Sequence, residues 1–259
     1  MAPKTPATTH PNFKERQPLG PLQVVATSPK LAALALCEIS RDLTSTHVHL
    51  VNAYTVALAA DSPEYLDTLQ GVAINLPDGK PLSWFSHAVG HKPVVQQVRG
   101  PQLFLDVFDV GRKFEVKHFL LGSTDDVLNK LKSNLEMKFP GALIVGMESP
   151  PFRAMTHEEQ TSQDQRIFKS GANIVWIGLG TPKQDLEAQR LSTSTGLTTV
   201  AVGAAFDFAA GTVREAPVWM TNTGFEWLFR LLSEPRRLWR RYLLGNLKFI
   251  KALVDGHRS

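Results

Sequence analysis

The sequence predicts an α/β fold of the Rossmann-like kind, in which a mostly parallel sheet carries helices on both faces. Short apolar runs of strand length recur along the chain, and segments with the period of an amphipathic helix separate them. Several runs also end in polar or glycine-rich loops, which is where parallel sheets place their ligands. The runs that we interpret as strands are residues 48–51, 72–76, 118–122, 142–147, 173–178 and 199–203.

The segments between these runs have helical periodicity, and several begin with capping residues. Thr156 stands three residues before Glu159, as in a capping box, and Thr124 precedes two aspartates. Thr181 followed by Pro182 predicts an N-cap and then the first helical residue. The predicted helices are residues 62–70, 81–89, 101–114, 124–139, 156–169 and 182–195.

The length of 259 residues is enough to bury a substantial core. Hydrophobic content of 43% and charged content of 20% are typical of a globular protein, and a net charge of +4 favours anionic partners. We expect one α/β domain over residues 22–225. Residues 1–21 are rich in proline, threonine and charge and predict a disordered leader, and residues 226–259 predict a helical appendage.

Three features favour the cytoplasm. The chain has no run of about 18 apolar residues, as a membrane-spanning helix needs. Its N-terminus lacks the apolar segment of a secretory signal. Cys37 is the only cysteine, so no disulfide forms within the chain, and its apolar neighbours predict a small buried side chain.

Two polar residues follow predicted strands and are candidates for chemistry. Asn52 follows the first strand and Asp78 the second, so both belong to the edge where α/β sheets bind ligands. Partial burial would raise the pKa of Asp78 and let it act as a general base on a hydroxyl. Asp78 could equally cap the helix that begins near Gly79, and the motif alone leaves both roles open.

The loop G-L-G-T-P-K-Q, residues 178–184, is a more specific signal. Its glycines let the backbone approach a ligand, and the N-terminus of the next helix attracts anions. The loop matches neither a P-loop nor a dinucleotide-binding motif, and Lys183 could also be an ordinary surface charge. The residues that we expect to meet phosphate or sugar oxygens are Gly178, Gly180, Thr181, Pro182, Lys183 and Gln184.

The end of the last predicted strand carries Phe206 and Asp207. We expect a turn there, in which the aromatic rings pack and the carboxylate binds either backbone amides or a ligand. A metal has little support, because the histidines show no H-E-x-x-H spacing and no D-x-D motif is present. The sequence therefore predicts a site that uses no metal and no cofactor.

The C-terminal segment separates apolar from basic residues. At about 100° per residue, leucine and aromatic side chains fall on one face, and Arg237, Arg241 and other cations fall on the other. This pattern is typical of a helix that lies on an anionic membrane surface. A helix docked on the core, a pairing face for a second copy, and a protein- or nucleic-acid-binding arm are the alternatives, and no RNA-binding motif accompanies the arginines.

Taken together, these motifs resemble the WecG/TagA/CpsF family of glycosyltransferases, glycosyltransferase family 26. The resemblance covers roughly residues 48–248 and rests on several segments. They are V-N-A-Y-T-V, L-P-D-G, R-G-P-Q-L-F, the loop at 178–184, G-A-A-F-D-F-A-A-G-T-V-R-E-A-P and W-L-F-R-L-L-S-E-P-R-R-L-W-R-R-Y-L-L-G-N.

The resemblance implies an inverting, metal-independent transfer of a sugar, such as N-acetylmannosamine, its uronic acid or glucose, from UDP to a polyprenyl-diphosphate-linked sugar. Such a protein works peripherally on the inner face of the membrane, in cell-surface polysaccharide or teichoic acid synthesis. By motif, Asp78 corresponds to the base, Asn52 to its neighbour in the pocket and Gln184 to a substrate contact. Arg237 and Arg241 correspond to cations that close over the donor diphosphate. The alternatives are a non-catalytic nucleotide-sugar-binding protein and a docking module.

The chain departs from the family pattern at two positions. Leu50 stands where many members have a threonine, and Gln97 where many have an arginine. We expect Arg99, two residues further on, to take the place of that arginine in substrate binding. The two changes leave the identity of the sugar and of the acceptor open.

Overall fold

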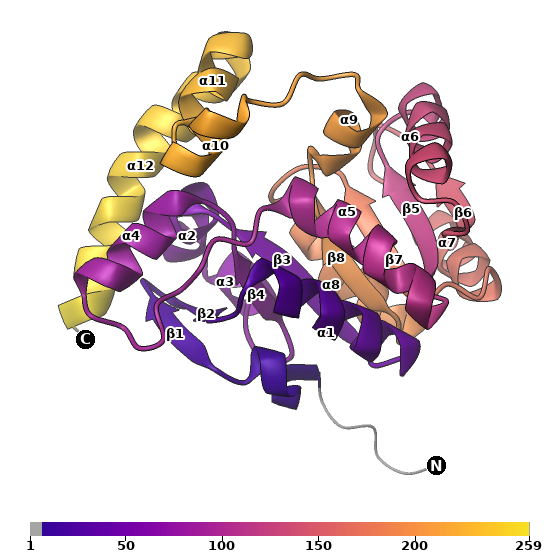
Figure 1. The fold of residues 1–259 in the computed structure, drawn as a ribbon, viewed down its shortest axis with the longest axis horizontal. Coiled ribbons are helices and arrows are strands. Elements are labelled where there is room, and N and C mark those ends of the chain that lie inside the picture. The colour runs from indigo at the N-terminus through magenta and orange to yellow at the C-terminus, as the bar shows by residue number, and fades with distance from the viewer. Residues whose placement is uncertain (1–6, 259) are drawn as a thin grey trace.

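The computed structural model describes residues 7–258, without the side chains of residues 9, 218, 222, 237, 240–242, 244 and 256–258. It contains a six-stranded sheet in the order β4-β3-β8-β7-β5-β6, and every neighbouring pair is parallel (Figure 1). The predicted α/β fold is therefore confirmed. The strands are β3 (Thr46–Val51), β4 (Ile74–Pro77), β5 (Lys117–Gly122), β6 (Leu143–Glu148), β7 (Ile174–Gly178) and β8 (Thr198–Ala201).

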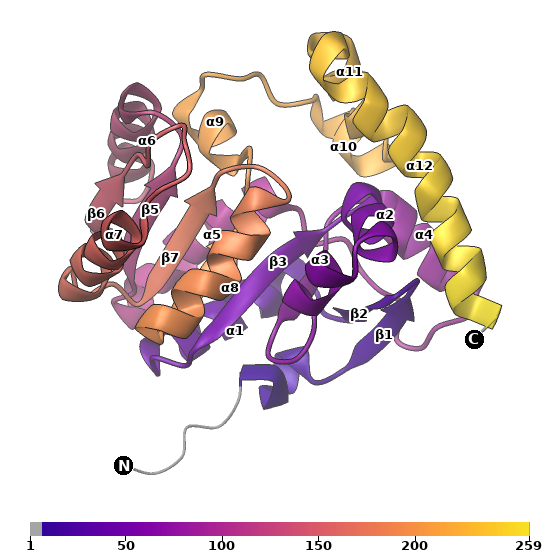
Figure 2. The same cartoon turned by 180° about the vertical axis from the view of Figure 1, so that it is seen from behind.

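Helices cover both faces of this sheet. On one face lie α1 (Pro29–Arg41) and α5 (Gly100–Gly111), as Figure 1 shows. Figure 2 shows α3 (Pro63–Thr68), α7 (His157–Lys169) and α8 (Lys183–Thr195) on the other. The remaining helices are α2 (Ala53–Asp61), α4 (Lys80–Ala88), α6 (Asp125–Lys138), α9 (Ala205–Ala210), α10 (Val218–Thr223), α11 (Glu226–Ser233) and α12 (Pro235–Arg258).

Four of these helices, α1, α2, α9 and α10, were not predicted. Helix α1 has the expected start, because the Ser28 side chain accepts the Leu31 N–H at 3.3 Å and Pro29 occupies the first turn. Helix α2 was missed because Asn52 was considered only as a site residue. In the structure the Asn52 side chain is the N-cap of α2.

The prediction of a disordered leader is wrong from residue 7 onward. Two short 3-10 turns, Ala7–Thr9 and Pro11–Phe13, lead into β1 (Arg16–Leu19), which pairs antiparallel with β2 (Leu22–Val25). The side chains of Phe13 and Leu19 are fully buried. Phe13 and Leu19 therefore pack this segment into the core, although its average composition is polar. Residues 1–6 lie outside the described part of the chain.

Helix α12 is partly a component of the core, which corrects the predicted boundary at residue 226. Phe249, Ala252 and Leu253 are buried in one cluster with residues of β1 and β2. At Gly245 the helix lies so close to α2 that an added Cβ would come within 3.3 Å of the Tyr54 ring. The C-terminal half of α12 therefore packs on the N-terminal hairpin and α2.

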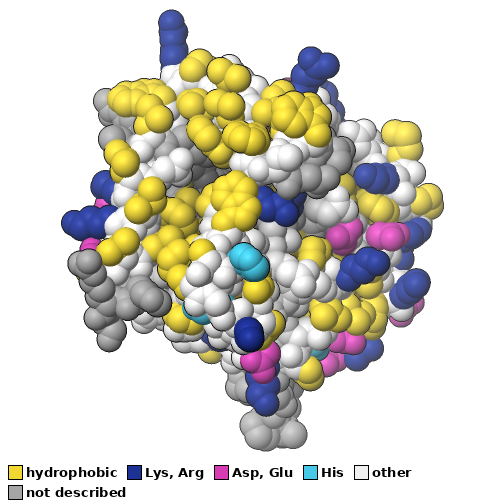
Figure 3. Space-filling view, turned by 60° about the vertical axis from the view of Figure 1, so that its left-hand side comes forward, with side chains coloured by type: hydrophobic (Ala, Val, Ile, Leu, Met, Phe, Trp, Pro, Cys, Tyr) yellow, Lys and Arg dark blue, Asp and Glu magenta, His cyan; other side chains and the backbone are white. Residues whose placement is uncertain are grey.

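A different side of α12 faces outward. Leu243, Leu247, Ile250 and Val254 are exposed, and their spacing of three or four residues puts them on one side of the helix. We call these four residues the α12 stripe. Figure 3 shows hydrophobic side chains gathered on the side of the molecule that α12 forms. Within residues 7–258, no helix is both long and apolar enough to cross a membrane.

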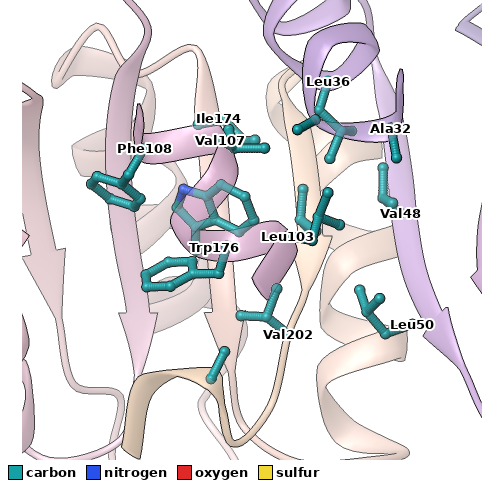
Figure 4. Close-up of a cluster of buried hydrophobic side chains, with 14 of the residues drawn as sticks. Ala32, Leu36, Val48, Leu50, Leu103, Val107, Phe108, Ile174, Trp176 and Val202 are labelled. Atoms are coloured by element: carbon teal, nitrogen blue, oxygen red, sulfur yellow. The ribbon is translucent and has the colours of Figure 1, made fainter. Parts of the chain in front are cut away.

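The main core surrounds Trp176 at the centre of β7 (Figure 4). Its indole N–H donates to His118 Nδ1 at 3.0 Å, and its ring meets that of Phe104 edge to face at 4.9 Å. Burial lowers the pKa of His118 to about 3, so this histidine is neutral. Cys37 is buried beside this core, as predicted, and burial raises the pKa of its thiol to about 12.

Candidate active site

A pocket of about 370 Å³ lies at the carboxyl ends of four adjacent strands, β4, β3, β8 and β7. Each strand end contributes to its lining, through Asp78, Asn52, Gly203 and Gly180 respectively. Helices α11 and α12 contribute to the same lining. The volume is within the range of small-molecule sites, and the position is the one at which open α/β sheets bind ligands.

Asp78 is fixed at one edge of this pocket by the backbone around it. Its N–H donates to the Val51 carbonyl at 2.6 Å, and Gly79, with φ of 125°, turns the chain into α4. The Asp78 carboxylate accepts the backbone N–H of Gly100, the first residue of α5. Because Gly79 is the N-cap of α4, the alternative role of Asp78 as that cap does not hold.

The pKa of Asp78 is raised to about 7, mainly because the carboxyl group is buried and secondly because Glu226 carries a negative charge nearby. Arg99, the Gly100 N–H and Arg230 act in the opposite direction and lower it. A carboxyl group with such a pKa is about half ionised at neutral pH. It can therefore accept a proton from a bound hydroxyl.

Gln184 closes the glycine loop over the end of β7. Its side-chain oxygen accepts the Gly180 N–H at 3.0 Å, and its side-chain amide lies 3.5 Å from the Thr181 hydroxyl. Gly203, at the end of β8, has φ of 55°, and a Cβ there would come within 3.1 Å of the same oxygen. Glycine at 203 thus lets two strand ends and Gln184 meet in the pocket wall.

Asn52 contributes to the pocket from the end of β3. Its side-chain oxygen accepts the N–H groups of Tyr54 and Thr55, at 3.0 and 3.3 Å. This cap holds the Asn52 amide against the lining and starts α2 at the same time. One residue therefore serves the fold and the site.

Arg99 does not line the pocket, although its charge lowers the pKa of Asp78. Its guanidinium donates to both carboxylate oxygens of Glu226, at 3.0 and 3.1 Å, and to Glu215 at 2.6 Å. We call Asp78, Arg99, Glu215 and Glu226 the front cluster. In this structure Arg99 ties α11 to the start of α5 instead of facing a ligand.

The wall formed by α11 and α12 was not predicted in detail. Glu226, Trp227 and Arg230 line the pocket from α11, and Asn246 and Ile250 from α12. A spacing of three and four residues puts Glu226, Trp227 and Arg230 on one side of α11, a signal that the sequence contains. The Arg230 guanidinium also lies over the Phe208 ring, at 5.6 Å.

Several predicted site residues are not part of the pocket lining. Gly178 is needed for packing, since a Cβ there would come within 2.7 Å of the Phe206 ring. Phe206 itself is buried in the core, and Asp207 belongs to α9 instead of a strand-end turn. Pro182 is the N-cap of α8, one residue later than predicted, and Lys183 is exposed. The side chains of Arg237 and Arg241 lie outside the described residues.

A second group of polar side chains lies between the sheet and its helices. His47 Nδ1 is 2.8 Å from His49 Nε2, and His49 Nδ1 is 2.9 Å from one Asp185 oxygen. The Tyr65 hydroxyl donates to the other oxygen at 2.9 Å. All four side chains are buried, and we call them the rear network. It joins α3 to β3 and α8, the two elements that carry Asn52 and Gln184 to the pocket.

A larger hollow of about 870 Å³ lies between α7 and α8. Its arginine, Arg190, is already paired with Asp164 at 2.8 Å and Glu187 at 2.7 Å. The hollow is lined from the two helices and holds no strand end. Among the described residues, no three His, Cys, Asp or Glu side chains are grouped to hold a metal ion. The absence of a metal requirement stays a prediction.

A pocket at parallel strand ends, with a carboxyl group of raised pKa and an arginine in its wall, is suited to an enzyme that transfers a group to a hydroxyl. Residues 19–258 match the sequence model described as "Glycosyl transferase WecG/TagA/CpsF family". The chain belongs to this family and is a glycosyltransferase.

Two curated relatives are similar over most of the chain. One, from Bacillus spizizenii (strain ATCC 23059 / NRRL B-14472 / W23), is 27% identical over 202 residues, which cover 78% of this chain and 76% of the relative. The other, from Bacillus subtilis (strain 168), is 25% identical over 197 residues, covering 76% and 74%. Both are named N-acetylglucosaminyldiphosphoundecaprenol N-acetyl-beta-D-mannosaminyltransferase.

Proposed function

We propose that the protein transfers a sugar from a UDP-sugar to a polyprenyl-diphosphate-linked sugar, with inversion and without a metal. Asp78 takes the proton from the acceptor hydroxyl. The hydroxyl oxygen then attacks the anomeric carbon of the donor, and the bond from that carbon to the diphosphate breaks, so that UDP leaves. The observation that carries this proposal is the pKa of Asp78, about 7, for a carboxyl group in the pocket wall.

The departing diphosphate needs positive charge, which Arg230 on α11 and Lys80 on α4 supply from the lining of the pocket. The backbone N–H groups at the start of α8 add the partial charge of a helix N-terminus beside Gly180 and Thr181. Such fixed groups act on the charge that develops as the bond breaks. The donor therefore binds with its diphosphate toward α8 and Arg230 and its sugar toward Asp78.

The acceptor class comes from the relatives, whose names specify a GlcNAc on undecaprenyl diphosphate. The polyprenyl chain of such an acceptor lies in a membrane, which fits the exposed α12 stripe and the exposed cations Arg236, Lys248 and Lys251. We propose that the protein works peripherally on the inner face of the cytoplasmic membrane, in cell-surface polysaccharide or teichoic acid synthesis.

The test is UDP release by the purified protein, with a panel of UDP-sugars and GlcNAc on a short polyprenyl diphosphate. We expect one donor to be used, activity that persists in EDTA, and a loss of about 10²–10⁴-fold in Asp78→Asn. Asp109→Asn, a change to an exposed carboxylate further along α5, is the matched control and keeps full activity.

Two outcomes would contradict the proposal. Loss of activity in EDTA that added Mg²⁺ restores would overturn the metal-free mechanism. Binding of UDP without transfer from any donor, and unchanged by Asp78→Asn, would favour a nucleotide-sugar-binding protein without catalysis.

A further inference from the structure

The pocket has a polar part and an apolar part. Asp78, Gln184 and Arg230 provide the polar groups, whereas Trp84 on α4 and Phe249 and Ile250 on α12 provide apolar lining. A ligand that matches both parts has a charged head and a hydrocarbon tail. The polyprenyl-diphosphate acceptor of the proposed function, on which this inference rests, is such a ligand.

The pocket cannot hold the whole of such an acceptor. Its volume of about 370 Å³ is that of a site for one drug-sized molecule. A sugar diphosphate uses that space, so a chain of many isoprene units must leave the pocket. Its route is set by the lining residues that are both apolar and open to the outside.

Trp84 and Ile250 combine these properties. Both line the pocket, and their exposed fractions are 55% and 58%. Helices α4 and α12, which carry them, contribute to the lining of the same pocket. The Trp84 ring is fixed from behind, because it lies so close to Gly224 that a Cβ there would come within 2.7 Å of the ring. Trp84 thus lines the pocket, packs against Gly224 and stays more than half exposed.

Ile250 also belongs to the α12 stripe. Leu247 lies one turn before it and Val254 one turn after, and both are exposed. The apolar lining of the pocket therefore continues along the side of α12 that carries Leu247, Ile250 and Val254. Burial of apolar groups against this surface would favour a hydrocarbon chain over water.

We propose that the polyprenyl chain of the acceptor leaves the pocket between Trp84 and Ile250 and runs along the α12 stripe. Trp84 and Ile250 thereby form a subsite for the first isoprene units, which distinguishes a long-chain acceptor from the sugar diphosphate alone. The stripe beyond Ile250 contacts the isoprene units that follow.

The experiment compares KM for two acceptors with the same sugar diphosphate, one on a polyprenyl chain of several isoprene units and one on a single unit. Detergent micelles replace membranes, so that vesicle binding does not enter the result. For Trp84→Ser and for Ile250→Ser we expect KM of the long acceptor to rise at least about tenfold, from the lost apolar contact. KM of the short acceptor should change less than about twofold, within the scatter of exposed-site changes.

Three further variants define the subsite. Trp84→Leu keeps an apolar contact and should retain most of the preference for the long acceptor. Val254→Ser changes the stripe outside the pocket and should raise KM of the long acceptor less than Ile250→Ser does, with KM of the short acceptor unchanged. Met137→Ser, at a 74% exposed position on α6, controls for the loss of any exposed apolar group.

The possible results separate the two proposals. Equal increases in both KM values would overturn the exit route and assign Trp84 to the head group. Unchanged KM values in both variants, with weaker vesicle binding, would make this surface a membrane contact only. Absence of transfer to either acceptor by the unsubstituted protein would instead contradict the proposed function.

Discussion

The front cluster and the rear network each contain one aspartate, Asp78 and Asp185, and the two aspartates differ in what surrounds them. In the rear network both Asp185 oxygens accept hydrogen bonds, from His49 and Tyr65, and none of the side chains reaches the pocket lining. In the front cluster Asp78 lines the pocket, and its pKa is raised. Burial with complete pairing thus gives a rigid support, and burial beside a cavity gives a group ready to exchange a proton.

The largest effect that we expect comes from breaking the rear network. Asp185→Ala leaves the His49 ring and the Tyr65 hydroxyl buried without their acceptor and should lower the free energy of unfolding by about 3–5 kcal/mol. Urea unfolding followed by circular dichroism measures it. Leu186→Ala, at the next and exposed position of α8, should cost far less, and equal losses would show that the network has no special weight.

Removing the charge of Asp78 should raise the free energy of unfolding instead of lowering it. The pKa of Asp78 is raised on folding, so its carboxyl group ionises less readily in the folded than in the unfolded protein. The folded state is therefore favoured while Asp78 is protonated, at pH 4, and loses this advantage as the pH rises through about 7. Asp78→Asn should therefore stabilise the protein at pH 8, by about 2 kcal/mol once screening by pocket water is allowed for, and leave it unchanged at pH 4. Thermal unfolding at both pH values would measure this, and an equal effect at both would contradict the raised pKa.

A smaller effect should follow from Glu226→Gln. The negative charge of Glu226 raises the pKa of Asp78, so its removal lowers that pKa and shifts the acidic limb of the pH–rate profile to lower pH. We expect a severalfold gain in rate at pH 6 and none at pH 9, where Asp78 is ionised in both proteins. Steady-state kcat/KM from pH 5 to 9 tests this. A uniform loss across the range would show that Glu226 mainly holds Arg99.

The smallest effect is expected where charges are neither buried nor beside the pocket. Lys132 and Glu136 are exposed on α6 and 3.8 Å apart. Lys132→Ala should change the free energy of unfolding by only about 0.3 kcal/mol, and less in high salt. A change above 1 kcal/mol in the same urea assay would mean that surface pairs stabilise this fold more than the comparison of the two clusters implies.

The sequence was informative where a residue's neighbours in the chain determine its role. Local sequence patterns predicted the six strands of the sheet and put Asn52, Asp78 and Gln184 at or near strand ends. The structure has these strands, and all three residues line the pocket. Contacts between segments that are far apart in the sequence were not predictable in this way. Gly178 looks like a ligand-binding glycine, but the ring that requires it belongs to Phe206, far along the chain.

The same limit applies to the two ends of the chain. The apolar side of the β1–β2 hairpin is buried in one cluster with residues of α2 and α12, and a polar leader gives no sign of that cover. The rear network was also invisible in the sequence, since Asp185 and Tyr65 are 120 residues apart. Residues that meet through the fold show no pattern in a single sequence.

The contact between α12 and the N-terminal hairpin has a consequence for synthesis of the protein. Leu19 and Leu22 are made long before Phe249 and Leu253, which follow them by more than 200 residues in the chain. The cluster that unites them cannot close until α12 has been made. A nascent chain must therefore keep its hairpin soluble while some 200 residues are added, about 10–40 s at typical elongation rates. A chain that is cut short before α12 would keep that apolar side open.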